Sequence, residues 1–401
     1  MNNRSHRPWL VPGARPVSGN HVRLLQSGAE FFPALIAAMD ATRVEILLET
    51  YIFNDDPSAA AVRDALMRAA QRGVRVRVLI DGVGSRDFPP SWRQALEQAG
   101  VSVMVYRPLR TGWRAYSSYY ANPRSLRRLH RKLAVIDARI AYLGGVNLID
   151  DFEPVRFDTP RLDFSVEVQG PLLASIHRHV RHLWRLVALT QLQAGNQPPV
   201  LEPTWPTDGH MRAAFVVRDN FAHRRDIERV YLAALALARQ EIVLACAYFL
   251  PGHRFRRLLK KAATRGVQVH LLVQGHTDHP LFQAAARALY RDLLAAGVRI
   301  YEYQASELHA KVAVVDSHWA TVGSSNIDPF SLLLAREANL VVDDAGFADD
   351  LRQRLHQAIA QSTPLDPAHW QRRPWPHRML SWLAYGSVRL MVGLVGAGRR
   401  V

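Results

Sequence analysis

The sequence predicts an α/β protein that consists of two homologous halves. Runs of β-branched residues alternate with helix-like segments, a pattern typical of helices layered on a sheet. Glycine-centred turns recur: Arg72-Gly73-Val74 returns as Arg265-Gly266-Val267, and Ala99-Gly100-Val101 returns as Ala296-Gly297-Val298. The offsets of 193 residues (73 to 266) and 197 residues (100 to 297) indicate a duplicated domain rather than a short structural repeat.

Apolar spacing and chain breakers place the elements of each half in order. Runs of Val, Ile and Leu predict strands, apolar residues three and four apart predict helices, and a glycine directly after a helical pattern marks its end. In the first half these signals predict strand 22–25, helix 31–41, strand 44–53, helix 59–72, strand 74–80, helix 92–99 and strand 101–106. In the second half they predict helix 227–239 and strand 241–249.

Changes in composition suggest five segments. Residues 1–20 are polar and contain proline, so we expect an irregular arm that is neither a signal peptide nor a membrane anchor. A cluster of prolines between 198 and 206 indicates a linker. The expected organisation is an arm 1–20, a first domain 21–196, a linker 197–209, a second domain 210–365 and a basic, apolar tail 366–401.

One motif occurs once in each half. The first copy runs from His130-Arg131-Lys132 to Asp137 and on to Gly144-Gly145-Val146-Asn147, and the second runs from His309-Ala310-Lys311 to Asp316 and on to Gly323-Ser324-Ser325-Asn326. The apolar run after each lysine predicts a buried strand, on which residues two apart share a face. We therefore expect His and Lys to face a common site, and Asp, on the opposite parity, to hold the turn.

The paired motif predicts phosphodiester chemistry. A single histidine on a strand is more often structural than catalytic, but two copies of a whole motif change that balance. Two imidazoles can act as nucleophile and general acid, while lysine, asparagine and serine can donate to phosphate oxygens. The sequence contains no Cys/His cluster with zinc-site spacing. We expect lysine to supply the positive charge, so that no metal or cofactor is needed and activity persists in chelator.

The doubled pattern His-x-Lys-x4-Asp-x6-Gly-Gly/Ser-x-Asn resembles the phospholipase D superfamily. The match covers most of the chain, and its finer details are similar to the bacterial cardiolipin synthases, above all the type without N-terminal membrane helices. The resemblance implies two phospholipase D-like domains, each a mixed β-sheet flanked by helices. It also implies a single active site at the pseudo-twofold interface between them.

The resemblance further implies a reaction and a role for each site residue. Phosphatidyl transfer between two phosphatidylglycerol molecules, through a phosphohistidine, would give cardiolipin and glycerol. His130 would attack and His309 would serve as acid and base, although the symmetry of the sequence does not decide between them. The other implied residues are Lys132, Asp137, Lys311 and Asp316 in the catalytic motifs, Asn147, Ser324 and Asn326 around the phosphate, and Asp163 and Glu337 orienting the histidines. Gly145 replaces the serine of the second copy, which predicts asymmetric phosphate binding.

The charge of the chain predicts an anionic partner. Lys and Arg number 51 against 35 Asp and Glu, a net charge of +16, which suits an acidic membrane or a nucleic acid. Segment 107–132 holds eight Lys and Arg, no acidic residue, and the aromatic residues Trp113, Tyr116, Tyr119 and Tyr120. We favour a membrane contact there; single-stranded nucleic acid and a solvated loop are the alternatives. The single cysteine, Cys246, excludes an internal disulfide and fits a reducing compartment.

The C-terminal tail gives a second indication of a membrane. Residues 379–395 form an apolar run of 17 residues that contains Arg389, and about 20 are needed to span a bilayer. Tryptophan near its start and arginines on both sides favour a helix in the membrane surface, while a helix packed on the core is the alternative. With the resemblance, this predicts a peripheral protein at the cytoplasmic face of the bacterial inner membrane, with phospholipid substrates and no nucleic-acid partner.

Other functions would use the same site. With water as acceptor, the site would be that of a phospholipase D or an endonuclease, and phosphatidylethanolamine is an alternative donor lipid. A non-enzymatic basic binding protein is the remaining alternative, but both copies of the motif are complete. The sequence does not define the oligomeric state.

Overall fold

The computed structural model describes residues 14–109, 127–152, 157, 159–192, 200–206, 208–276 and 279–397. The elements of the first half are β1 (Val17–Gln26), α1 (Ser27–Ala41), β2 (Glu45–Thr50), α2 (Pro57–Gln71), β3 (Arg75–Asp81), α3 (Pro90–Gln98), β4 (Ser102–Tyr106), β5 (Leu133–Ile136), β6 (Ile140–Gly144), β7 (Phe164–Gln169) and α5 (Leu173–Thr190).

The second half begins with β8 (Met211–Arg218). It continues with α6 (Asp226–Leu237), β9 (Glu241–Cys246), α7 (His253–Thr264), β10 (Gln268–Gln274), α8 (Pro280–Ala295), β11 (Arg299–Tyr303), β12 (Lys311–Val315), β13 (Trp319–Gly323), α9 (Pro329–Leu333), β14 (Glu337–Asp343), α10 (Ala345–Ala360) and β15 (Ser362–Pro364). Two further helices, α11 (Pro367–Arg372) and α12 (Trp375–Ala397), form the tail.

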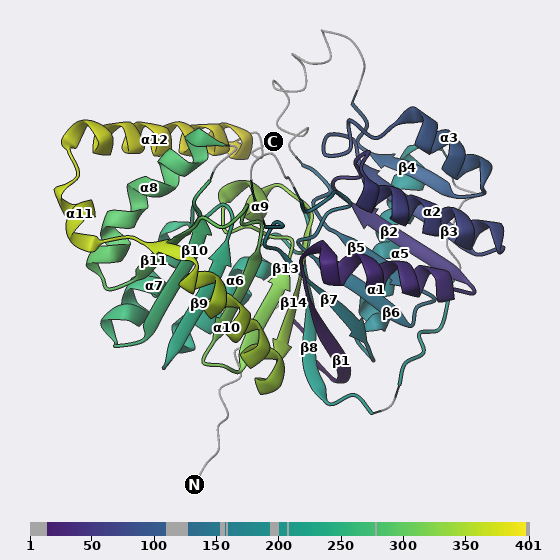
Figure 1. The fold of residues 1–401 in the computed structure, drawn as a ribbon, viewed down its shortest axis with the longest axis horizontal. Helices are drawn as coiled ribbons and strands as arrows, with labels where there is room; N and C mark the ends of the chain where they lie inside the picture. Colours follow the sequence, from purple (N-terminus) through teal and green to yellow (C-terminus); the bar gives the residue numbers. More distant parts are fainter. Residues whose placement is uncertain are drawn as a thin grey trace.

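Within the described residues, fifteen strands form one sheet that runs through both halves (Figure 1). Their order is β15-β11-β10-β9-β12-β13-β14-β8-β1-β7-β6-β5-β2-β3-β4. In each half, three parallel strands (β2-β3-β4 and β9-β10-β11) continue into antiparallel strands (β5-β6-β7 and β12-β13-β14). Strands β1 and β8 pair antiparallel where the halves meet. The predicted α/β fold with two like domains, each a mixed sheet, is confirmed.

The two halves share part of their hydrophobic core. On one face of the first half, α1, α2 and α3 cover the sheet with Leu35, Leu66 and Leu96. On another face, Ile176 of α5 and Leu351 of α10 belong to one continuous cluster that includes strands of both halves. Because this cluster crosses the junction between β1 and β8, side chains from the two halves are held in a fixed relation.

Two strands end earlier than predicted. The runs 44–53 and 241–249 predict strands, but β2 stops at Thr50 and β9 at Cys246. The apolar residues beyond these ends are buried in core formed by helices and sheet, as Phe53 and Phe249 are. β1 differs in the other direction, since it starts at Val17, inside the segment expected as an arm.

The tail combines the two alternatives that the sequence left open. Helix α12 packs along α8 (Figure 1). Its inner face is buried, with Val388 0% and Ala384 7% exposed, and joins the core of the second half. Its outer face is apolar and exposed, with Leu380 at 62% and Leu383 at 60%. In the part of the chain that the structure describes, no helix is long and apolar enough to cross a membrane.

Candidate active site

The segment that carries His130 pairs with the second half of the chain. Leu129 and Arg336 form an isolated parallel bridge next to the histidine. The backbone N–H of His130 donates to the carbonyl oxygen of Arg336 at 3.0 Å, and the N–H of Arg336 donates to Arg128 at 2.8 Å. His130 therefore lies beside Glu337, which is the next residue of that strand.

His309 is held by the equivalent pairing in the opposite sense. Leu162 and Leu308 form the bridge, the N–H of His309 donates to the carbonyl oxygen of Leu162 at 2.9 Å, and the N–H of Leu162 donates to Glu307 at 2.9 Å. Asp163 follows directly. Each histidine thus meets a carboxylate from the other half, and we call this arrangement the crossed pairing.

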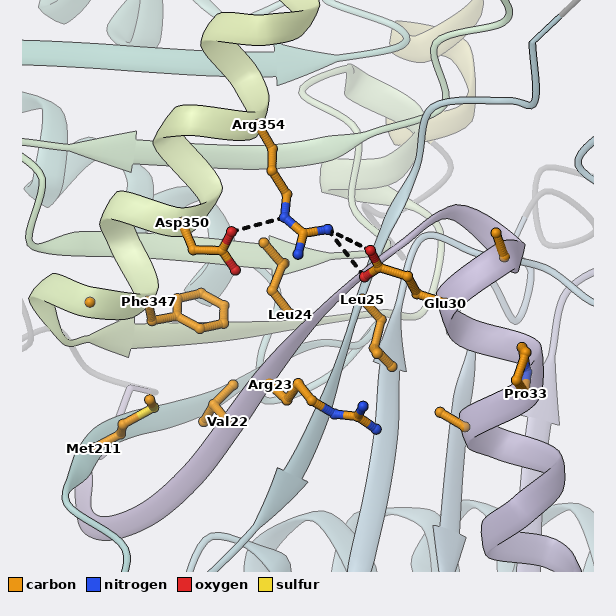
Figure 2. A pocket seen from close by; sticks show the side chains of 13 residues that line it. Val22, Arg23, Leu24, Leu25, Glu30, Pro33, Met211, Phe347, Asp350 and Arg354 are labelled. Carbon is orange, nitrogen blue, oxygen red and sulfur yellow. Dashed lines mark hydrogen bonds and ion pairs between the residues drawn. The ribbon is translucent and has the colours of Figure 1, made fainter.

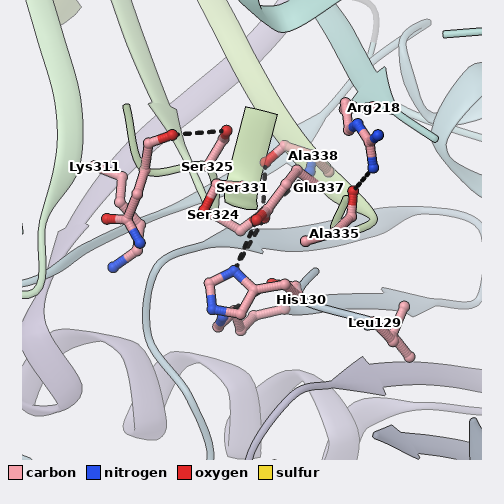
Figure 3. A network of polar contacts seen from close by, with 12 residues as sticks. Leu129, His130, Arg218, Lys311, Ser324, Ser325, Ser331, Ala335, Glu337 and Ala338 are labelled. Atoms are coloured by element: carbon pink, nitrogen blue, oxygen red, sulfur yellow. Dashed lines mark hydrogen bonds and ion pairs between the residues drawn. The ribbon is translucent and has the colours of Figure 1, made fainter. Parts of the chain in front are cut away.

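The two carboxylates orient the two imidazoles. Nδ1 of His130 lies 3.0 and 3.1 Å from the oxygens of Glu337 (Figure 3), and Nδ1 of His309 lies 2.5 Å from Oδ2 of Asp163. Both carboxylates are buried, whereas the histidines keep 17% and 15% of their side chains exposed. A carboxylate accepts a hydrogen bond from Nδ1–H, so the arrangement leaves Nε2 of each ring for a substrate.

The residue after each motif glycine fits the length of the acid behind it. Ser324 donates its hydroxyl proton to Glu337 and accepts the N–H of Ala338 at 3.1 Å. In the first half a Cβ on Gly145 would lie 2.0 Å from Oδ1 of Asp163, so only glycine leaves room for that carboxylate. The structure therefore places Ser324 behind Glu337, and its contact with the phosphate stays a prediction. Its hydroxyl is used to fix the acid.

The two motif lysines lie buried behind the histidines. Nζ of Lys132 donates to the carbonyl oxygen of His130 at 2.8 Å, and Nζ of Lys311 donates to that of His309. Burial lowers the pKa of Lys132 to about 7, and burial also lowers the pKa of Lys311. Among the described residues, neither lysine lines a cavity beside the histidines, so each acts on the site through its charge.

Burial also sets the direction of the other pKa shifts. It lowers the pKa of His130, and together with the charges of Lys311 and Arg161 it lowers that of His309 further. Burial raises the pKa of Asp163 to about 6, against the opposing charge of Lys311. The lowered pKa values of the two histidines favour neutral imidazoles.

The two asparagines border the site on opposite sides. Asn147 lines a cavity of about 460 Å³ together with His130 and His309, and its Oδ1 accepts the N–H of Ile52 at 3.2 Å. Asn326 lines a cavity of about 280 Å³ that reaches His130, and its Oδ1 accepts from Sγ of Cys246 at 3.9 Å. Because each oxygen already has a donor, the amide nitrogens are the groups left for a ligand.

The motif aspartates lie at the far ends of their strands, away from the histidines. Asp137 accepts the N–H groups of residues 43–45 at 2.8–2.9 Å, and Asp316 accepts those of residues 239–241 at 2.8–3.2 Å. Both have a positive φ, a conformation that aspartate tolerates better than most residues. Their position agrees with the turn-holding role that strand parity predicts, and they contact no imidazole.

The basic segment 107–132 divides into two parts. Its aromatic residues and three of its arginines lie outside the described residues (110–126). Of the rest, Arg128 pairs with Asp81 at 2.8 Å and Arg131 with Glu49 at 2.7 Å, and all four side chains are buried. Asp81 also accepts the N–H of Leu129 at 2.8 Å. These arginines therefore fix the segment before Lys132, and their charges are paired inside the protein rather than presented to a membrane.

Sequence reasoning missed several residues around the histidines. Tyr51 and Tyr248 follow the early ends of β2 and β9 and line both cavities, and the ring of Tyr51 lies 4.8 Å from that of His130. Arg161 and Glu307 line the cavity of about 460 Å³ and form an ion pair with an N···O distance of 2.8 Å. The recurrence of Tyr after each strand was the signal that could have identified the tyrosines.

A larger cavity lies elsewhere. It measures about 770 Å³ and runs between α1 and α10 over β1, with the Glu30–Arg354 ion pair across it (Figure 2). It contains no motif residue. In the described part of the chain, no group of three or more His, Cys, Asp or Glu side chains is placed to hold a metal ion.

A duplicated α/β fold in which one histidine of each half faces a shared cavity, backed by a carboxylate of the opposite half, defines a phospholipase D-like site. Comparisons with known proteins agree. The family model described as "Cardiolipin synthase, PLD-like domain" matches residues 35–151 and 231–359.

Similar proteins extend over nearly the whole chain. Cardiolipin synthase B of Salmonella typhimurium is 39% identical over 395 residues, which cover 94% of this chain and 90% of the relative. Cardiolipin synthase A of Pseudomonas putida is 32% identical, covering 85% of this chain and 69% of the relative. The crystal structure of phosphatidylserine synthase from Haemophilus influenzae shares the fold, with a TM-score of 0.67, 15% identity, and 92% and 94% of the two chains covered. The chain belongs to the phospholipase D-like cardiolipin synthase family, which confirms the resemblance seen in the sequence.

Proposed function

We propose that this protein is a cardiolipin synthase, which transfers a phosphatidyl group from one phosphatidylglycerol to a second and releases glycerol. The observation that carries the proposal is the pair of histidines, one from each half, that line one cavity with a buried carboxylate behind each ring. The 39% identity to a cardiolipin synthase B over most of the chain favours a lipid hydroxyl over water as the acceptor.

In the first step, Nε2 of His130 attacks the phosphorus of the donor lipid. The P–N bond forms while the bond from phosphorus to the oxygen of the headgroup glycerol breaks. His309 gives a proton to that oxygen, and glycerol leaves. The lowered pKa of His130 keeps its ring neutral and nucleophilic near pH 7. Burial and, after it, nearby positive charges lower the pKa of His309. A bound anionic phosphodiester offsets those charges and so favours the proton that this residue must donate.

In the second step, a hydroxyl group of the second phosphatidylglycerol enters on the side that the glycerol has left. His309 removes its proton, the oxygen attacks phosphorus, and the P–N bond to His130 breaks. Two easier displacements replace one difficult exchange, which is the usual gain of covalent catalysis. Lys132, Lys311, Asn147 and Asn326 stabilise the negative charge on the phosphoryl oxygens in both steps.

The products of the reaction test this function. Purified protein is incubated with vesicles of phosphatidylglycerol, and the lipids are identified by mass spectrometry while free glycerol is assayed. Cardiolipin and glycerol in equal amounts are expected. Phosphatidate as the main product would identify a phospholipase D instead. Vesicles that also contain phosphatidylethanolamine decide the donor, because its use would release ethanolamine.

The apolar face of α12 is the proposed contact with the membrane. Phe282 of α8 lines the cavity of about 280 Å³, and α12 packs along α8, so this face belongs to the helix layer that borders the site. Trp382 of α12 is 49% exposed, and tryptophan is a residue type that favours the headgroup region of a membrane. We place the protein peripherally at the cytoplasmic face of the bacterial inner membrane, where anionic lipid attracts its net charge of +16.

Substitution on the exposed face of α12 tests the membrane contact. The double variant Leu380→Gln/Leu383→Gln leaves the buried face of the helix intact, and we expect its sedimentation with phosphatidylglycerol vesicles to fall. Its activity on detergent-dispersed lipid should stay near wild type. Leu189→Gln, at an equally exposed position on α5 (55% exposed), is the matched control. Unchanged sedimentation of the double variant would remove α12 from the membrane contact.

A further inference from the structure

The two cavities beside the histidines differ in the charged residues that line them. Arg161 stands two residues before Asp163, and Ala335 stands two residues before Glu337, so the crossed pairing gives the two residues equivalent places. Arg161 lines the cavity of about 460 Å³, which both histidines reach. Ala335 lines the cavity of about 280 Å³, which reaches His130, alongside Val83 and Phe282. At this position the cavity shared by both histidines has a cation where the other has a methyl group. At the position of Glu307, the other cavity has Arg128.

A second difference explains why Arg161 is held at the cavity. In the first half, Asp81 accepts the N–H of Leu129 and binds Arg128 in a buried ion pair. In the second half, the neutral Gln274 accepts the corresponding N–H of Leu308 at 2.7 Å. The residue that corresponds to Arg128 is Glu307, and it binds the guanidinium of Arg161 across the halves instead.

The guanidinium of Arg161 is oriented and only partly used. Its Nε and one terminal nitrogen bind Oε2 of Glu307 at 2.9 and 2.8 Å. The Arg161 side chain is 17% exposed, so the group borders the cavity without lying in bulk water. Guanidinium groups present several donors in one plane and match phosphate oxygens well, so the other terminal nitrogen suits a ligand phosphate.

The stereochemistry of the proposed reaction requires a second phosphate on this side. The acceptor hydroxyl must approach phosphorus opposite to His130, on the side of His309. Of the two cavities beside the histidines, the one of about 460 Å³ is lined by His309. The acceptor is itself a phosphodiester, with its own phosphate one glycerol unit away from the reacting hydroxyl. The cavity of about 460 Å³ must therefore accommodate two anionic groups, one at the histidines and one beyond them.

We propose that Arg161, held by Glu307, binds the phosphate of the acceptor phospholipid and selects an anionic, hydroxyl-bearing lipid for the second step. This inference rests on the proposed function, because it assumes a phosphatidyl group on His130. It assigns the first step to groups that do not include Arg161, since the donor phosphate lies at the histidines.

Two reactions of the same enzyme separate these steps. Exchange of labelled glycerol into phosphatidylglycerol requires the covalent intermediate but no acceptor phosphate, whereas cardiolipin synthesis requires both. The ratio of synthesis to exchange cancels any effect of the substitution on the intermediate or on His309. In Arg161→Gln and in Arg161→Lys, which keeps the charge but loses the planar fork, we expect this ratio to fall about tenfold or more. The KM for phosphatidylglycerol in synthesis should rise.

The controls distinguish the outcomes. Arg68→Gln removes an exposed arginine that also binds a carboxylate, that of Asp40, through Nε and one terminal nitrogen, and its ratio should match wild type. Equal losses of exchange and synthesis in both Arg161 variants would make the ion pair with Glu307 purely structural and overturn the proposal, as would an unchanged ratio. If wild-type protein neither exchanges glycerol nor makes cardiolipin, the proposed function itself has failed.

Discussion

The two histidine half-sites have the same backbone and different side chains behind it. Both histidines are placed by the crossed pairing, with near-equal exposure and a carboxylate at Nδ1. His130 is backed by Glu337, which Ser324 fixes through its hydroxyl. His309 is backed by Asp163, which is one methylene shorter, fills the space beside Gly145, and accepts the N–H of Phe164 at 2.8 Å.

This comparison teaches that the position of the imidazole is kept while its electrostatics differ. The long acid is paired with serine and the short acid with glycine, so each pair fills the same space. Burial raises the pKa of Asp163 to about 6, against the charge of Lys311. The acid behind each ring holds Nδ1–H and stabilises the imidazolium, so a difference between the two acids is expected to affect the two steps differently.

The largest effect should come from removing the histidines one at a time. We expect His130→Ala to lower transfer by at least about 10⁴-fold and to form no covalent intermediate, because no other described side chain replaces the nucleophile. His309→Ala should lose about 10²- to 10⁴-fold and release the phosphatidyl group slowly. The protein is allowed to react with labelled phosphatidylglycerol, the reaction is quenched, and the label that stays on the protein is measured. Label retained on the His130→Ala protein would reverse the two roles.

The next largest effect concerns the acids. Glu337→Gln and Asp163→Asn keep the shape of the side chain but replace the carboxylate with an amide. An amide N–H facing Nδ1 would favour the wrong imidazole tautomer and would not stabilise the imidazolium. We expect each to lower kcat about 10²- to 10⁴-fold with little change in melting temperature. Glu337→Gln should slow formation of the intermediate and Asp163→Asn its breakdown, as rapid-quench kinetics can measure. An identical effect on both steps from either variant would show that the half-sites are not specialised.

The pH dependence sharpens the electrostatic side of the comparison. The charged form of Lys132 is the one that stabilises phosphate, and with its pKa lowered to about 7 this charge is present below that pH and lost above it. We expect kcat/KM, which reports the free enzyme, to fall about tenfold per pH unit on the alkaline side. Bound phosphodiester favours the charged lysine, so the same limb in kcat should lie at higher pH. Lys132→Arg should remove the limb near 7, and a profile identical to wild type would assign that limb to another group.

The smallest effect should come from the residues that fit the acids into place. Ser324→Ala removes one hydrogen bond to Glu337, and we expect kcat to fall roughly tenfold at most, in the formation step alone. The reciprocal change, Gly145→Ala, should be worse, because its Cβ would meet the carboxylate of Asp163. Thermal unfolding of both variants is the control. A larger loss in Ser324→Ala that raises the KM for phosphatidylglycerol would return Ser324 to the phosphate.

The sequence predicted the parts of the site that are local and repeated. The motif, the strand after it and the opposite parity of Asp137 were readable because they depend on neighbouring residues. The orienting acids Asp163 and Glu337 came from resemblance. The structure places both at Nδ1 of a histidine, but at the histidine of the other half.

Long-range partners could not be predicted in this way. Arg128 and Arg131 were interpreted as part of a basic surface, yet they are buried in ion pairs with Asp81 and Glu49. These partners lie 47 and 82 residues earlier in the chain, so local sequence does not reveal them. Ser324 was predicted at the phosphate because a hydroxyl group can donate, and the hydrogen bond that it gives to Glu337 appears only in the fold. The same limit hid Arg161, whose partner is 146 residues away.

The crossed pairing also ties chemical competence to completion of the chain. During synthesis the first half emerges with His130 and Lys132 but without Glu337, so its nucleophile has no orienting acid until the final strands are added. The second half is equally incomplete without Asp163. A fragment that ends before Glu337 would therefore lack the acid that holds Nδ1 of His130.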